Sequence, residues 1–151
     1  MSSRIRATSW LMVSLVACFV TATGASAGVL FTVDSTLDQV DDDIGHGICH
    51  TTANTCTLRA AVMQANLMTG PGVTIDLPTG IYILTRPPIV PYGPDDGDLN
   101  LTTPAIGSPV ISIFGAGQAA TIIDANQLDR VFYVEVGRSA ALSRLTVRNG
   151  S

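Results

Sequence analysis

The chain has 151 residues, of which 46% are apolar, 5% aromatic and 13% charged. So few charges exclude a disordered acidic tail and a coiled coil, both of which need many more. The formal net charge of −4 argues against nucleic-acid binding, because a phosphate backbone requires a basic face. Lys is absent, Glu occurs once, and 14 Gly and 8 Pro are present, so the composition argues against a mostly helical protein.

Residues 1–27 have the pattern of an export signal. Two arginines precede an apolar run over residues 10–20, which is too short to cross a membrane. Ala25-Ser26-Ala27 then predicts cleavage between Ala27 and Gly28. We therefore expect a secreted or cell-surface protein without an integral membrane span in the mature chain.

An alternative start lies at Leu15-Val16-Ala17-Cys18, which resembles a bacterial lipobox. In that case Cys18 would carry a lipid, and the protein could be associated with the outer membrane. We favour the later cleavage site, because Phe19 and Val20 continue the apolar run of the signal.

The mature chain keeps two cysteines, Cys49 and Cys56. An exported protein meets an oxidising compartment, so we predict a disulfide between them. His46 and His50 lie nearby, and the alternative is a Cys/His zinc site. The ligand spacings of structural zinc sites do not fit this arrangement well.

A short strand is predicted over residues 29–33, followed by a polar loop over residues 34–50. Carboxylates in a flexible loop are the ligands that Ca²⁺ prefers, although their spacing does not match an EF-hand. The alternative is a solvated acidic loop. The candidate calcium ligands are Asp34, Asp38, Asp41, Asp42 and Asp43.

One helix is predicted over residues 57–68, capped by Thr55 or Thr57 and ended by Gly70-Pro71-Gly72. Its apolar stripe has helical spacing and is made of small residues, which indicates close packing against a flat surface. The stripe consists of Leu58, Ala61, Val62 and Ala65, whereas Arg59, Gln64 and Asn66 fall outside it.

From residue 73 onward, short β-rich runs alternate with turn residues. The predicted strands are Val73–Leu77, Ile81–Leu84, Leu99–Leu101, Val110–Phe114, Thr121–Asp124, Val131–Val136 and Leu142–Val147. Two runs recur after an interval in the low twenties: Ile111–Phe114 corresponds to Phe132–Glu135, and Ile122–Ile123 to Leu145–Val147. Such a period, with few hairpin signals, favours a parallel β-helix (solenoid) over a sandwich.

In a β-helix, inward aliphatic side chains stack from one coil to the next. The interior candidates are Ile111, Ile113, Ile122, Val131, Val134, Leu142, Leu145 and Val147. The residues expected at turns or pointing outward are Asp124, Arg130, Arg138, Arg144 and Arg148. The first coil has an exposed edge, and we expect the helix to cover it as an N-terminal cap.

Several segments resemble one family. Cys56-Thr57-Leu58-Arg59-Ala60-Ala61-Val62 with Gln64-Ala65-Asn66 resembles the CSLREA motif of secreted bacterial proteins, with Ala60 where the motif has Glu. Phe31-Thr32-Val33-Asp34-Ser35, Leu77-Pro78-Thr79-Gly80 and Leu145-Thr146-Val147-Arg148-Asn149-Gly150 also resemble this family. The resemblance implies export and a right-handed parallel β-helix similar to pectate lyases and polymorphic outer-membrane proteins. It implies no particular activity.

The predicted organisation is a signal peptide over residues 1–27, a cap over 28–72 and β-helix coils over 73–151. A coil motif stands directly before Ser151. Because solenoids need a cap at both ends, we expect the chain to be truncated, and a fragment without independent function is one alternative.

A polysaccharide lyase or glycosidase acting on acidic glycans is the enzymatic alternative. Its candidate residues are Asp124, Asp129, Arg130, Arg144 and Arg148, with the adjacent pair Asp95 and Asp96 considered for hydrolysis. These residue types are also routine at turns, so no catalytic residue is assigned.

Aromatic residues that could support glycan binding are few: Tyr82, Tyr92, Phe132 and Tyr133. We therefore expect a non-catalytic, adhesin-like interaction module whose partners are extracellular glycans or surface proteins.

Overall fold

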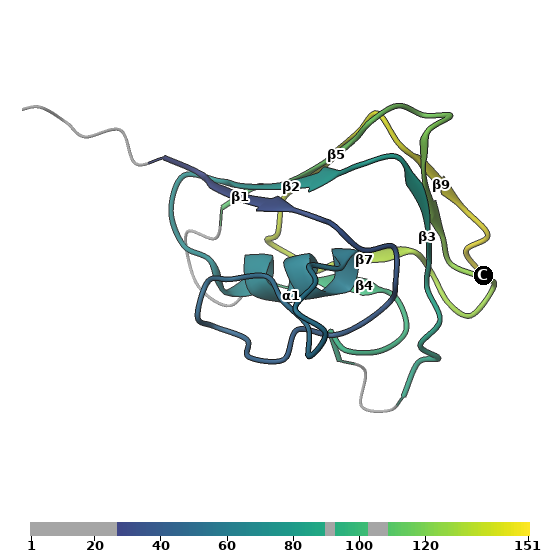
Figure 1. The fold of residues 1–151 in the computed structure, drawn as a ribbon, viewed down its shortest axis with the longest axis horizontal. Coiled ribbons are helices and arrows are strands. Elements are labelled where there is room, and N and C mark those ends of the chain that lie inside the picture. Colours follow the sequence, from purple (N-terminus) through teal and green to yellow (C-terminus); the bar gives the residue numbers. More distant parts are fainter. Residues whose placement is uncertain (1–26, 90–92, 103–108) are drawn as a thin grey trace, which may run out of the picture.

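The computed structural model describes residues 27–89, 93–102 and 109–151 (Figure 1). The predicted signal sequence up to residue 26, with Cys18 in it, lies outside these residues, as does Tyr92. In chain order the elements are β1 (Val29–Thr32), α1 (Leu58–Leu67), β2 (Val73–Leu77), β3 (Gly80–Ile83), β4 (Leu99–Leu101), β5 (Ile111–Gly115), β6 (Thr121–Asp124), β7 (Phe132–Val134), β8 (Ala140–Ser143) and β9 (Thr146–Arg148).

The strands form three sheets in which all the neighbouring strands are parallel. A four-stranded sheet has the order β1-β2-β5-β8, a three-stranded sheet β3-β6-β9, and a two-stranded sheet β4-β7. After β1 and α1, the chain passes through the four-stranded, three-stranded and two-stranded sheets in that order, and then repeats the order. The protein is therefore mainly β with parallel pairing, as the strand pattern predicts.

The core lies between the sheets and consists of rows of aliphatic side chains in register. Ile75 pairs with Ile113 in the four-stranded sheet, and both are completely buried. Tyr82 pairs with Ile123 in the three-stranded sheet, with exposed fractions of 4% and 0%. Alternate residues of each strand point to the same face, so one register places whole rows in the core.

Helix α1 begins and ends close to the predicted bounds. Thr57 is its N-cap, and its Oγ1 accepts a hydrogen bond from the backbone N–H of Ala60 at 3.1 Å. The small residues Ala61 and Ala65 are completely buried, and the helix packs against β2 and β4. In Figure 1 the helix lies beneath β1 and β2 and beside β4.

The polar residue Asn66 joins the helix to the outer edge of β4. Its side-chain N–H donates to the backbone oxygen of Asn100 at 2.8 Å, and its Oδ1 accepts from the backbone N–H of Thr102 at 3.0 Å. The amide thus takes the hydrogen bonds that a neighbouring strand would take. Asn66 therefore covers part of the free edge of β4.

The predicted repeat interval is wrong for one of its two pairs. Ile111–Phe114 lies beside Ala140–Ser143 and not beside Phe132–Glu135. Ile122 and Ile123 lie beside Thr146 and Val147, as predicted. Only the strands must stack in register, whereas the loops between them vary in length, so a fixed interval is not required.

The predicted strand Leu142–Val147 is two strands in different sheets, β8 and β9. Between them Arg144 has a φ of 57°, a left-handed conformation that turns the chain from one sheet to the next. The same corner explains Gly115, because a Cβ there would lie 2.2 Å from the backbone oxygen of Arg144. Only glycine permits this approach.

The interior assignments are partly wrong. Ile111, Ile113 and Val131 are buried, but on β6 the residue completely buried is Ile123 and not Ile122. Val134, Leu142 and Val147 are in register with the buried Leu101, Ile113 and Ile123, yet they are 43–46% exposed. They lie on β7, β8 and β9, the last strand of each sheet in the described chain. Leu145 is partly buried against the core.

Two residues expected at the surface are buried. Asp124 is 7% exposed and Arg138 is 6% exposed, whereas Arg130, Arg144 and Arg148 are exposed as predicted. Arg138 donates from Nη2 to the backbone oxygen of Ala65 at 3.0 Å, near the C-terminal end of α1. A cation is favourable at this end of a helix, while burial lowers the pKa of Arg138.

Candidate functional site

The side chain of Arg59 is completely buried and connects three segments of the chain. Its Nε and Nη2 donate to the two carboxylate oxygens of Asp38, at 2.5 and 3.2 Å. The remaining donors reach backbone oxygens of the loop before β4. These acceptors are Pro94, Asp96, Gly97 and Asp98, at 2.8–3.3 Å. Asp38 also accepts from the backbone N–H of Thr85, at 2.8 Å.

Gln64 holds the acidic loop against the opposite side of the helix. Its Oε1 accepts from the backbone N–H groups of Gly45 and Gly47, at 3.2 and 3.3 Å. Its Nε2 donates to Asp41 Oδ1 at 2.8 Å and to the backbone oxygen of Asp43 at 3.0 Å. Gln64 is completely buried, so the polar face of the helix is covered by the loop instead of by water.

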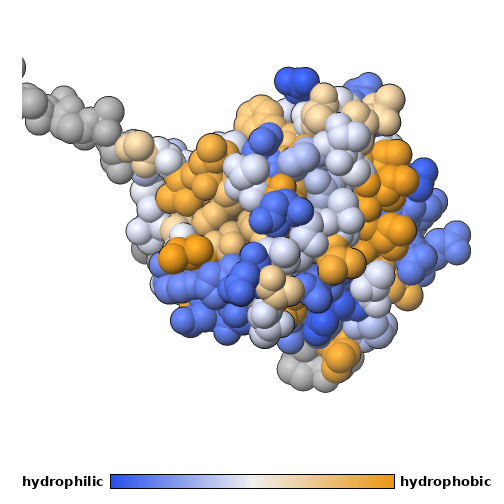
Figure 2. Space-filling model, viewed as in Figure 1, coloured by the Kyte–Doolittle hydropathy of each residue, from blue (hydrophilic) through white to orange (hydrophobic). Residues whose placement is uncertain are grey.

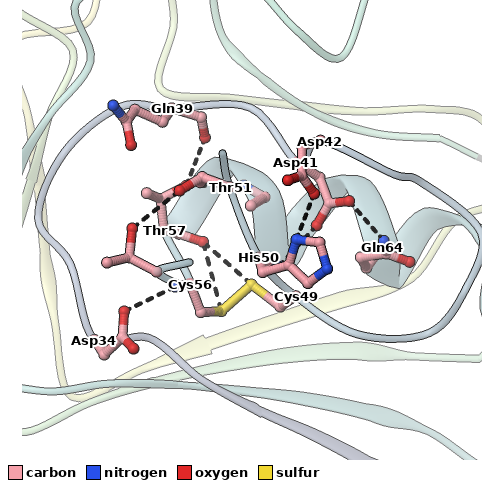
Figure 3. The surroundings of a disulfide bond; sticks show 12 residues. Asp34, Gln39, Asp41, Asp42, Cys49, His50, Thr51, Cys56, Thr57 and Gln64 are labelled. Carbon is pink, nitrogen blue, oxygen red and sulfur yellow. Dashed lines mark hydrogen bonds and ion pairs between the residues drawn. A yellow bond between two sulfur atoms is a disulfide. The ribbon is translucent and has the colours of Figure 1, made fainter. Parts of the chain in front are cut away.

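The predicted disulfide between Cys49 and Cys56 is present, with a Cα–Cα distance of 5.1 Å (Figure 3). It joins the end of the acidic loop to the residue before the helix N-cap. The backbone N–H of Cys56 also donates to Asp34 Oδ1 at 2.7 Å. Both sulfurs are in the disulfide, so neither is available as a thiolate ligand of the alternative zinc site.

Removing this disulfide by replacing both Cys49 and Cys56 with serine is expected to lower the free energy of unfolding by about 2–3 kcal/mol, because the unfolded chain loses a constraint. Urea-induced unfolding followed by circular dichroism measures the change. Dithiothreitol should destabilise the natural protein to a similar extent and leave the double variant unaffected. An equal response of both proteins to the reductant would contradict this prediction.

The five candidate calcium ligands bind different groups of the protein. Asp34 accepts from Cys56, Asp38 from Arg59, and Asp42 contacts Nδ1 of His50. Asp41 accepts from the backbone N–H groups of Asp43 and His50, each at 3.1 Å. Among the residues with described positions, no group of three or more His, Cys, Asp or Glu side chains could hold a metal ion. Calcium binding stays a prediction.

A cleft of about 470 Å³ lies over β4 and β7. It is bounded by Gly93 and Pro94 on one side and lined by Asn100, Thr102, Arg130, Tyr133 and Glu135. Its volume is in the range of small-ligand sites. Tyr133 and Arg130 are candidates from the sequence, but the cleft was not predicted, because Gly93, Pro94 and Asn100 carry no sequence signal for one.

Arg130 is fixed at the end of this cleft. Its Nε and Nη2 each lie 2.8 Å from Oδ2 of Asp98, whose side chain is only 4% exposed. Its guanidinium carbon lies 5.1 Å from the centre of the Tyr133 ring. Burial raises the pKa of the Asp98 carboxyl, and the adjacent Arg130 opposes this rise.

A second ion pair joins Asp124 to Arg148, at 2.8 Å. Asp124 also accepts from the backbone N–H of Asn126 at 2.9 Å and from the side-chain amide of Asn149 at 3.0 Å. These hydrogen bonds lower the pKa of Asp124, and the one from the backbone N–H of Asn126 has the largest effect.

This lowered pKa predicts a pH dependence. The stabilisation by Asp124 is complete above the ordinary pKa of an unfolded aspartate, about 3.9, and is lost as the pH falls through the lower folded value. The Asp124→Asn variant should therefore lose less stability than the natural protein below about pH 4. Urea titrations at several acidic pH values compare the two. Parallel losses would contradict the assignment.

The candidate lyase residues fall into separate interactions. Arg130 and Arg148 line one groove, but Arg130 pairs with Asp98 and Asp129 and Arg148 with Asp124. Arg144 donates to the backbone oxygen of Ala116. Asp96 is 6% exposed and accepts from the backbone N–H of Ile89. Of the aromatic candidates, Tyr82 is buried and Phe132 is partly buried in the core.

No protein-family model matches the chain, and no curated protein or solved structure matches it. In the part of the chain that the structure describes, no helix has the length and apolar character needed to span a membrane.

Proposed function

We propose that the three parallel sheets are the faces of a right-handed parallel β-helix, and that each passage of the chain through them is one coil. In this proposal α1 and the loop held by the disulfide form the N-terminal cap of the coils. The repeated order of the sheets supports it, as do the buried rows that continue from strand to strand. The resemblance to CSLREA-containing secreted proteins points in the same direction.

The protein is, in this proposal, exported to the cell surface or the medium. The pattern of residues 1–27 supports export, and the disulfide suits an oxidising compartment. The acidic composition supports a role that does not involve nucleic acid.

Its function is that of a non-catalytic surface module that binds extracellular glycans or surface proteins. The observation that carries this proposal is the cleft over β4 and β7, in which Arg130, the one cation among the described lining residues, is bound to the buried carboxylate of Asp98. Exposed aliphatic side chains also gather over β3, where Ile81 and Ile83 are 48% and 43% exposed (Figure 2). Such surfaces commonly mark interaction sites.

Expression of the full chain in a bacterial host, with a C-terminal tag, tests this function. We expect mass spectrometry to find an exported product that begins at Gly28, and this product to bind to bacterial or host cell surfaces. A product that begins at lipidated Cys18 would support the lipoprotein alternative. A cytoplasmic product, or release of unsaturated sugars from acidic glycans, would overturn the proposal.

A further inference from the structure

The cleft over β4 and β7 has walls that the cap holds in place. Arg59 binds the backbone oxygen of Pro94 in the wall, and Asn66 binds the backbone oxygen of Asn100 in the floor. The side chain of Asn100 in turn donates to the backbone oxygen of Gly93 at 2.7 Å. These parts of the wall and floor are therefore held by buried or partly buried hydrogen bonds, and their positions do not depend on a ligand.

Tyr133 and Arg130 form a stacked, partly exposed pair of planar side chains that lines this cleft. The Tyr133 residue is 41% exposed, and the guanidinium of Arg130 lies against its ring. Because Asp98 holds two nitrogens of Arg130, the guanidinium cannot move away without leaving a buried carboxylate unpaired. Planar side chains with polar ends suit ligands that present both apolar and hydroxyl-bearing faces.

The charges around the cleft disfavour an anionic ligand. Arg130 is the one cation among the lining residues that the structure describes, and Asp98 and Asp129 both lie beside it. Glu135 adds a further carboxylate to the lining. A uronate would have to compete with Asp98 for Arg130 and would approach these carboxylates. A ligand with uncharged hydroxyl groups meets neither obstacle.

We propose that this cleft binds an uncharged saccharide, with Tyr133 and Arg130 as its platform and the polar groups of Asn100 and Glu135 beside it. This inference rests on the proposed function as an interaction module and specifies its ligand class. It differs from the acidic glycans expected for a pectate-lyase-like enzyme.

Isothermal titration of the exported protein with soluble oligosaccharides tests the ligand class. The probes are cellohexaose, xylohexaose and mannohexaose as neutral sugars, and oligogalacturonate and chitosan oligomers as anionic and cationic ones. We expect binding to at least one neutral probe that is at least tenfold tighter than to oligogalacturonate. Tighter binding of oligogalacturonate or of chitosan, or no binding of any neutral probe, would overturn the inference.

Matched variants locate the site. Tyr133→Ala should weaken binding of the neutral probe at least tenfold, and Tyr133→Phe should retain most of it. Phe114→Ala is the control, because Phe114 is also 42% exposed but lies on the four-stranded sheet, and it should bind normally. Equal loss in the Tyr133→Ala and Phe114→Ala variants would overturn the location.

If the protein binds cell surfaces but no neutral probe, the proposed function survives and the ligand class fails. If it binds neither, both fail.

Discussion

Replacing Arg59 with alanine is expected to lower the free energy of unfolding by about 3–5 kcal/mol, because it leaves the buried Asp38 carboxylate unpaired. Asp38 is 2% exposed at its side chain, so water cannot replace the lost donors. Four backbone oxygens of the loop before β4 lose a donor at the same time. Urea-induced unfolding followed by circular dichroism measures the loss.

Two further variants make this test specific. Arg144→Ala removes an exposed arginine with one backbone contact and should change stability by less than about 0.5 kcal/mol. Arg59→Lys keeps the charge but cannot match the planar geometry of the guanidinium, so it should recover only part of the loss. If Arg59→Ala and Arg144→Ala were equally stable, the structural role of Arg59 would be wrong.

Ile123→Ala is expected to cost about 2–5 kcal/mol through the cavity that it leaves, whereas Ile122→Ala should cost less than about 1 kcal/mol. The two residues are adjacent and chemically identical, but only Ile123 is completely buried. The midpoints of urea unfolding compare them directly. A larger loss in Ile122→Ala would mean that β6 presents its other face to the core, and equal losses would also contradict the assignment.

The elements that the sequence predicted well are those with local signals. The helix is defined by an N-capping threonine and a spaced stripe of small residues, and both are confirmed. The strands begin and end near Gly, Pro and Asn, so most of their bounds lie within a few residues of those predicted. The disulfide was predicted from two cysteines in a chain whose sequence predicts an export signal.

The failures come from interactions between distant residues. Arg59 and Gln64 fall outside the apolar stripe, yet both are buried because residues 94–98 and 41–47 supply their hydrogen-bond partners. Hydrophobic periodicity counts aliphatic side chains and does not detect polar residues buried in this way. The choice between Ile122 and Ile123 failed for a related reason, since two adjacent isoleucines give no alternation to follow.

The hydrogen bonds of Asn66 to β4 also bear on behaviour at high concentration. The amide of Asn66 occupies one acceptor and one donor of the β4 edge, the Asn100 oxygen and the Thr102 N–H, so these two groups cannot pair with a strand of another molecule. At high protein concentration, pairing of β4 between molecules should therefore be disfavoured. Replacing Asn66 with an aliphatic residue should promote fibrillar self-association.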